Sequence, residues 1–189
     1  MIDIEETSLR YDLTRGTFSG DETHVLHSQK HLNALCGVFA DEKARAAMDP
    51  ETVVYFVEMH DAEKNGTVGG LLFGTSFVNS GKVGDEYFMT QGHFHEKREC
   101  AEYYWCIRGE GLLLLQSEDG CVRAEKMSAG TLHYISGRTA HRLVNTGKDV
   151  LAVGACWPSD AGHDYAIAKT GFRVVVKEVN GKVKIISKD

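Results

Sequence analysis

The chain has 189 residues and a formal net charge of −6, with acidic and basic residues interspersed. A chain of this length can bury about 70% of its extended surface around a single core, so one domain is expected. The charge pattern argues against a nucleic-acid or anionic-membrane partner, and no apolar run approaches the ~18 residues of a membrane helix.

The N-terminus and the cysteines predict where the protein resides. The first residues lack the basic-then-apolar pattern of a secretory signal. The five cysteines are odd in number and form no Cys-x-x-Cys pair, which indicates reduced thiols. We therefore expect a cytoplasmic protein.

The first fifty residues read as an arm with a helix. Residues 1–27 mix polar residues with isolated apolar ones, which predicts one or two short strands. Between residues 28 and 49, apolar residues recur at intervals of three and four from Leu32 to Phe39, which predicts a helix. Pro50 should end it.

Beyond residue 50, short apolar runs alternate with turn residues, and the chain has twenty glycines against two prolines. This composition favours many strands, with turns at residues 118–120 and 180–181, and so an antiparallel barrel or sandwich. No linker or repeat divides the chain, so we expect one domain, with an arm over 1–50 and a barrel over 51–189. The expected strands are 53–57, 69–78, 86–90, 102–107, 111–116, 121–126, 131–135, 140–145, 150–156, 172–178 and 183–186.

The segment around His93 and His95 carries the chemistry. In an extended strand the two side chains point to the same face, roughly 7 Å apart along the backbone, and can share one ion. Residues 96–101 read as a turn that lets Glu102 fold back beside them. A second hairpin would bring His141 to the same place. The pattern predicts a site of three imidazoles and one carboxylate.

This ligand set suits Fe(II), Mn(II), Ni(II) or Zn(II), and no cysteine pair at ligand spacing suggests a closed zinc site. An octahedral ion with four protein ligands keeps two open positions, where a substrate with two adjacent oxygens can bind for Lewis-acid or redox chemistry. A lone His-x-His pair often arises by chance. The hypothesis therefore depends on the whole set, including Glu102 and His141.

With these residues in place, the chain resembles the cupin superfamily. The first cupin motif is similar to Gly92-His93-x-His95, then Glu102 and Gly109; the second is similar to Gly130, His141 and Asn145. The sequence departs from the usual pattern in two ways. Six residues separate His95 from Glu102, and Ser136 and Arg138 replace the usual proline and glycine.

The longer spacing resembles the cupin-type glucose-6-phosphate isomerases. Their signature segments are similar to residues 88–95, 101–104, 140–145 and 158–165 of this chain. The resemblance implies an all-β fold, a cupin double-stranded β-helix (jelly-roll) barrel with an N-terminal arm containing a short helix. It also implies a homodimer that interconverts glucose 6-phosphate and fructose 6-phosphate in glycolysis and gluconeogenesis.

The resemblance further implies one divalent metal per subunit, Fe(II) before Mn(II), Ni(II) or Zn(II), and it assigns roles to particular residues. The metal ligands would be His93, His95, Glu102 and His141. The sugar phosphate would be held by Thr75, Ser76, Thr90 and Gly92, with Tyr104, His163 and Tyr165 along the sugar chain. Catalysis would use Glu102, Tyr104 and His163.

Several alternatives stay open at this stage. The isomerisation can follow an enediol path, with Glu102 as base and Tyr104 or His163 as proton relays, or a hydride shift that needs no base. Tyr104 can instead be a core residue, and we expect His133 to be structural. A metal-dependent dioxygenase of the acireductone type and a non-catalytic sugar-binding cupin are the competing functions. The native metal, a side activity on mannose 6-phosphate, the dimer interface and the residues that hold the phosphate are not determined by the sequence.

Overall fold

A computed structural model describes residue 4 and residues 6–188, and in it nearly all regular structure is β-strand. The all-β class predicted from the sequence is confirmed. The strands are β1 (Leu9–Tyr11), β2 (Phe18–Gly20), β3 (Val25–His31), β4 (Val53–His60), β5 (Leu71–Val78), β6 (Lys82–Val83), β7 (Glu86–Tyr87), β8 (Glu102–Arg108), β9 (Glu110–Ser117), β10 (Val122–Ser128), β11 (Leu132–Ile135), β12 (Thr139–Asn145), β13 (Leu151–Pro158), β14 (Val174–Val179) and β15 (Lys182–Ser187). The helical segments are a 3₁₀ turn η1 (Leu32–Leu35), α1 (Glu42–Ala46) and α2 (Ala166–Thr170).

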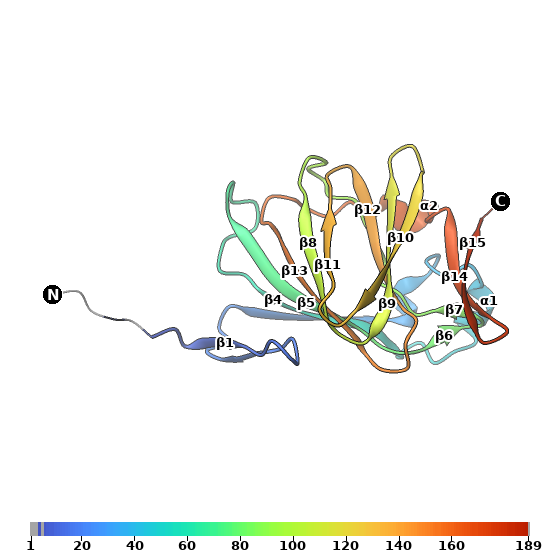
Figure 1. Ribbon diagram of the computed structural model, residues 1–189, viewed down its shortest axis with the longest axis horizontal. Coiled ribbons are helices and arrows are strands. Elements are labelled where there is room, and N and C mark those ends of the chain that lie inside the picture. The colour runs from blue at the N-terminus through green and yellow to red at the C-terminus, as the bar shows by residue number, and fades with distance from the viewer. Residues whose placement is uncertain (1–3, 5, 189) are drawn as a thin grey trace.

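The strands curve around a common interior (Figure 1). The largest sheet has the order β11-β8-β13-β5-β4-β3, and a three-stranded sheet has the order β10-β9-β12. A four-stranded sheet, β15-β14-β7-β6, lies at the end of the molecule away from β1 (Figure 1). All the strand pairs between these elements are antiparallel. Because β3 pairs with β4 along its whole length, residues 25–31 lie in the main sheet.

The helix predicted over residues 28–49 is wrong in extent. Residues up to His31 complete β3, and only η1 and the short α1 are helical. Pairing with β4 holds the first residues extended, and Gly37, with φ of 78°, separates the two helical pieces. α1 begins at a cap in which the Asp41 carboxylate accepts the N–H of Ala44 at 2.8 Å. Local periodicity was therefore overridden by strand pairing.

The predicted hairpin turn at residues 180–181 is confirmed. It joins β14 to β15 with both central residues in the left-handed region, Asn180 at φ 52° and Gly181 at φ 69°. Positive φ at both positions is what a two-residue hairpin turn requires, and asparagine followed by glycine meets it at low cost.

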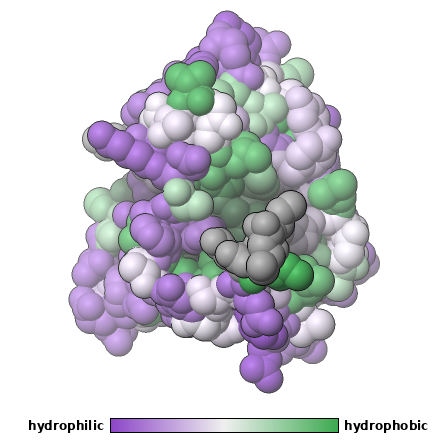
Figure 2. All heavy atoms as spheres, turned by 90° about the vertical axis from the view of Figure 1, so that its left-hand side faces the viewer, coloured by the Kyte–Doolittle hydropathy of each residue, from purple (hydrophilic) through white to green (hydrophobic). Residues whose placement is uncertain are grey.

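The interior is filled from both barrel sheets. Leu113 and Leu115 of β9, Leu143 of β12 and Val153 of β13 are all at most 1% exposed. On the face turned toward the viewer in Figure 2, the molecule is hollowed at its centre, with hydrophobic side chains inside a largely hydrophilic rim. Within the described residues, the helices are all too short to cross a bilayer.

Candidate active site

Four side chains from different parts of the barrel converge on one point. His93 and His95 precede β8, Glu102 begins β8, and His141 lies in β12. One ligand atom from each of the four lies within 4.8 Å of the others. The structure thus brings together all four residues that the sequence predicted as ligands.

Backbone pairing sets this convergence. The N–H of His93 donates to the carbonyl of His141 at 3.3 Å, and the N–H of His141 donates to that of His93 at 3.0 Å. The two rings therefore lie side by side, with centroids 4.3 Å apart. The expected strand through His93 and His95 is wrong: this segment makes only isolated bridges, at His93 and Phe94. It pairs with β12 at one residue and with Asp164 at the next, so no continuous ladder forms.

Two of the histidines are held in the tautomer that a metal ligand needs. Nδ1 of His95 lies 2.9 Å from the carbonyl oxygen of Cys100, and Nδ1 of His141 lies 3.2 Å from that of Thr139. A carbonyl oxygen only accepts, so Nδ1 carries the hydrogen in each ring. The lone pair of Nε2 then points into the site, as in metal centres with carbonyl-anchored histidines.

The inner atoms of the cluster have no hydrogen-bond partner. Nε2 of the three histidines and Oε1 of Glu102 are buried and unsatisfied. Nε2 of His141 is 2.6 Å from this oxygen, and Nε2 of His95 is 3.3 Å away, yet neither pair has hydrogen-bond geometry. Buried polar atoms are rarely left unpaired, and four facing one point fit a divalent cation.

Electrostatics favour the ligand forms of Glu102 and His93, whereas at His95 burial is outweighed by the Glu102 carboxylate, which raises the pKa. Burial alone would raise the pKa of Glu102, but His141 and His95 outweigh it and lower that pKa to about 2. Burial, with His141, His163 and His95 nearby, lowers the pKa of His93 well below its usual value. The carboxylate is therefore ionised and the His93 imidazole neutral at neutral pH, as ligation demands.

The cavity beside the cluster is lined by all the predicted substrate residues: Thr75, Ser76, Thr90, Gly92, Tyr104, His163 and Tyr165. Their side chains differ in what they can offer. The Thr75 hydroxyl lies 2.6 Å from the Tyr11 hydroxyl of the arm. Because neighbouring residues of a strand face opposite ways, Ser76 presents its side chain to the cavity and Thr75 presents backbone.

Thr90 and Tyr104 have hydroxyl groups suited to donation. The Thr90 hydroxyl accepts the N–H of Leu143 at 3.0 Å, so its own hydrogen is free for an anion. Tyr104 is buried, with its ring centroid 5.6 Å from that of His141. Burial and the Glu102 carboxylate raise the pKa of Tyr104 well above its ordinary value, so the phenol stays protonated.

His163 and Tyr165 stand at the mouth of the cavity. Their rings stack with an interplanar angle of 9°, and the His163 ring centroid lies 4.5 Å from that of His93. Both side chains remain partly exposed. Partial burial of the ring lowers the pKa of His163, so the ring is neutral at neutral pH.

Comparison with known proteins decides the family. The family model described as glucose-6-phosphate isomerase matches residues 29–188. The chain belongs to the glucose-6-phosphate isomerase family. It is 39% identical to the glucose-6-phosphate isomerase of Pyrococcus horikoshii, over 96% of this chain and 95% of that protein. It is 41% identical to the enzyme of Thermococcus litoralis, over 87% of this chain and 89% of that protein.

The family and the cupin barrel predicted from the motifs are therefore confirmed. Among solved structures, Bacillus subtilis oxalate decarboxylase, described for its Mn(II) centres, is similar with a TM-score of 0.46 and 19% identity. That similarity covers 58% of this chain and 27% of the decarboxylase, and is too distant to carry an argument.

Sequence reasoning missed two features of this member of the isomerase family. Tyr55 lines the cavity without belonging to any predicted motif, and Gln91, although it lies in the signature segment 88–95, was given no role there. Residues 53–57, Val-Val-Tyr-Phe-Val, form an unbroken apolar run that predicted a strand, but nothing in it indicated a cavity.

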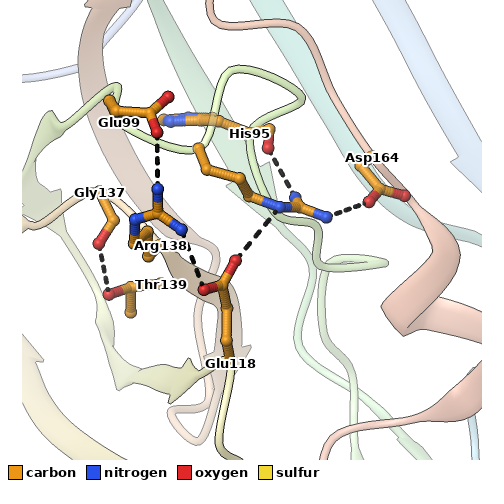
Figure 3. A network of polar contacts seen from close by, with 8 residues as sticks. His95, Glu99, Glu118, Gly137, Arg138, Thr139 and Asp164 are labelled. Carbon is orange, nitrogen blue, oxygen red and sulfur yellow. Dashed lines mark hydrogen bonds and ion pairs between the residues drawn. The ribbon is translucent and has the colours of Figure 1, made fainter.

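The second missed feature is a network of ion pairs around Arg98. Its Nη1 donates to the carbonyl of His95 at 2.6 Å, its Nη2 pairs with Asp164, and its Nε lies 3.6 Å from Glu118 (Figure 3). Arg138, which pairs with Glu99 and Glu118, extends this network. The network thereby joins residues 96–101, which lie between His95 and Glu102, to the segment that carries His163 and Asp164.

Proposed function

We propose that the chain catalyses the reversible isomerisation of glucose 6-phosphate and fructose 6-phosphate with a divalent metal held by His93, His95, Glu102 and His141. The observation that carries the proposal is the set of four buried ligand atoms without partners, beside a cavity lined by hydroxyls. Because the chain belongs to the glucose-6-phosphate isomerase family, we infer that the substrate is a sugar phosphate.

Glu102, Tyr104 and His163 have different protonation states and would therefore have different roles in the reaction. A bound divalent ion would supply Lewis-acid chemistry at two adjacent substrate oxygens. Glu102, ionised and beside that position, can accept a proton from carbon. Tyr104 stays protonated and can donate a hydrogen bond to a substrate oxygen, whereas neutral His163 can take up a proton.

The polar groups of the cavity lining suit the phosphate group. Ser76 and Thr90 can each donate a hydroxyl hydrogen, and Gly92 adds a backbone N–H. Tyr165, stacked on His163, would pack along the sugar chain. Donors of this kind bind phosphate oxygens without a charged side chain inside the cavity.

The finer parts of the proposal have different sources. Fe(II) as the native metal and a homodimer follow from the family resemblance, and a cytoplasmic location follows from the N-terminus and the cysteines. A single domain with an arm over 1–50 and a barrel over 51–189 follows from the lack of a linker or repeat, with β3 of the arm pairing into the main sheet. The choice between proton transfer through an enediol and a hydride shift is left to isotope experiments.

The test is a coupled assay in which fructose 6-phosphate is supplied and glucose 6-phosphate is detected. The protein is stripped with a chelator and refilled separately with Fe(II), Mn(II), Ni(II) and Zn(II). We expect turnover to return with metal and to be lost in His93→Ala. His133→Phe is the matched control, because His133 is also buried but its ring nitrogens are hydrogen-bonded elsewhere.

Stoichiometric metal binding without turnover under any metal would contradict the isomerase. The same preparations would then be placed in an oxygen electrode with acireductone-like substrates, where metal-dependent oxygen consumption would establish a dioxygenase instead. Turnover that survives chelation and the His93→Ala change would contradict the role of the metal.

A further inference from the structure

Arg142 is a buried charge that the proposed chemistry does not use. It lies in β12 between His141 and Leu143, which both line the cavity, so its own side chain points to the opposite face of the strand. Its exposure is only 2%. Burying a guanidinium without a carboxylate is costly, and such a group calls for an explanation.

The partners of this guanidinium are all neutral. Its Nη1 lies 3.1 Å from the sulfur of Met89, its Nη2 donates to the carbonyl of Gln91 at 2.6 Å, and its plane lies 4.5 Å from the centre of the Phe172 ring. Nε is buried and has no partner. Over the described residues, no carboxylate comes within ion-pair distance of Arg142.

The wider surroundings compensate this charge only in part. Glu86 is the carboxylate whose field reaches Arg142, and its Oε2 already accepts the N–H of Ala40 at 2.8 Å. The same carboxylate also acts on Lys177 and Lys188. One negative group therefore faces three positive ones. An arginine keeps its positive charge at neutral pH even when it is buried.

The bond to Gln91 fixes the orientation of a peptide in the cavity wall. The described chain has no cis peptide, and in a trans peptide the C=O and N–H point in opposite directions. Because the carbonyl of Gln91 faces Arg142 behind the wall, the N–H of Gly92 faces away from it, on the side of the cavity that Gly92 lines. Across the described residues, this N–H has no acceptor.

The arrangement requires a glycine at position 92. Its φ is 76°, and a Cβ built on it would lie 2.7 Å from Cε2 of Phe172 and 3.0 Å from Nε of Arg142. The glycine thus lets the stacked guanidinium and ring approach the back of the peptide. A donor N–H on one side and an unpaired cation directly behind it are the elements of an anion site.

We propose that Arg142 is a specificity-determining positioning residue for the phosphate of the substrate: from behind the cavity wall it orients the Gln91–Gly92 peptide and supplies the positive charge. The proposal rests on the sugar-phosphate substrate class put forward above. It predicts a preference for phosphorylated ligands that depends on a residue outside the cavity.

The test compares the binding of glucitol 6-phosphate and glucitol to metal-loaded protein by calorimetry. In the wild type, the phosphate should strengthen binding at least about 100-fold. In Arg142→Met this preference should fall at least about tenfold, with glucitol affinity and metal content unchanged, and Arg142→Lys should lie between the two. In the isomerase assay, KM should rise in Arg142→Met while kcat changes little.

Arg123→Met is the matched control, since it removes the same charge from a side chain that is 59% exposed. It should retain the full preference. A folded Arg142→Met or Arg142→Lys protein with the wild-type preference would overturn the proposal. If neither variant folds, the Arg142 Nε–H signal of the wild type decides in NMR: it should shift with glucitol 6-phosphate and not with glucitol, and equal behaviour would also overturn it.

These readouts separate this inference from the proposed function. A wild type that prefers the phosphorylated ligand through Arg142 but shows no turnover would contradict the isomerase and leave the phosphate site standing. Normal turnover with an unchanged preference in the variants would do the reverse.

Discussion

His133 and His141 are both buried histidines of the same barrel, and their surroundings differ in one respect. His133 is 6% exposed, with Nδ1 2.6 Å from a carboxylate oxygen of Glu125 and Nε2 2.9 Å from the Thr131 hydroxyl. His141 is 1% exposed, with Nδ1 on a backbone carbonyl and Nε2 unpaired. One ring is fully satisfied by its own neighbours, and the other is satisfied on one side only.

This difference separates a structural histidine from a proposed ligand better than burial does. Each of the two rings lies near a glutamate. In the structural pair the carboxylate accepts a hydrogen bond, whereas Glu102 and His141 approach closely without one. The comparison makes quantitative predictions, because equal substitutions at the two places should have unlike effects.

The largest effect is expected from Glu102→Gln, with Glu125→Gln as its matched control. Loss of the buried negative charge removes both a ligand and the proposed base, so kcat/KM should fall by about 10²–10⁴-fold. Metal content, measured by mass spectrometry, should drop below one ion per chain. Glu125→Gln should keep both metal and activity, and equal losses in the two variants would refute the distinction.

Metal removal should come next in size. A ligand at 100 times its dissociation constant stabilises the folded state by about 2.7 kcal/mol, so stripping the wild type should lower its Tm by roughly 5–10 °C. Calorimetry on chelated and refilled protein measures the shift. It should persist in His133→Phe and vanish in His141→Ala. A shift that persists in His141→Ala would mean that the ion binds elsewhere, and its loss in His133→Phe would mean that the site needs His133.

His133→Phe should destabilise the protein by about 1–3 kcal/mol, because two hydrogen bonds are lost from a buried ring. Glu125 limits the loss, since its side chain is 31% exposed and can bind water. Urea unfolding of the apo form gives the value. Metal affinity should be that of the wild type, and a weakened affinity would show that His133 supports the site after all.

The smallest effect is expected from Thr131→Val, which removes one hydroxyl and nearly preserves shape. The hydroxyl contacts Nε2 of His133 and accepts the N–H of Ser128 at 3.3 Å. We expect a loss of about 1 kcal/mol in the same urea experiment. If the losses of unfolding free energy in Thr131→Val and His133→Phe add up in the double variant, the two side chains do not interact. That result would contradict a hydrogen bond between the Thr131 hydroxyl and the His133 ring.

The metal cluster was predictable because ligand chemistry restricts residue type. Few side chains bind a divalent ion, so His93, His95, Glu102 and His141 stood out in the sequence although the strand expected through the first two does not form. Strands from 102 onward were predictable because short apolar runs end at turn residues such as Asn180 and Gly181.

The position of Arg142 was not predictable. Its contacts with Met89, Gln91 and Phe172 come from segments far apart in the chain, and an arginine in a strand ordinarily points to water. The helix expected over residues 28–49 failed for a similar reason, since pairing of β3 with β4 is a non-local effect. The pattern within one stretch of sequence gives no information about the distant segment that will pair with it.

The pair of backbone bonds between His93 and His141 also bears on when an ion can be captured. Strands β8 to β11 lie between the two residues in the chain, so these bonds cannot close before that whole stretch has been synthesised. A newly synthesised chain therefore offers passing ions scattered imidazoles, on which the Irving–Williams order would favour copper and nickel. Only the finished barrel presents the four proposed ligands together, so an ion that needs all four of them would bind after folding.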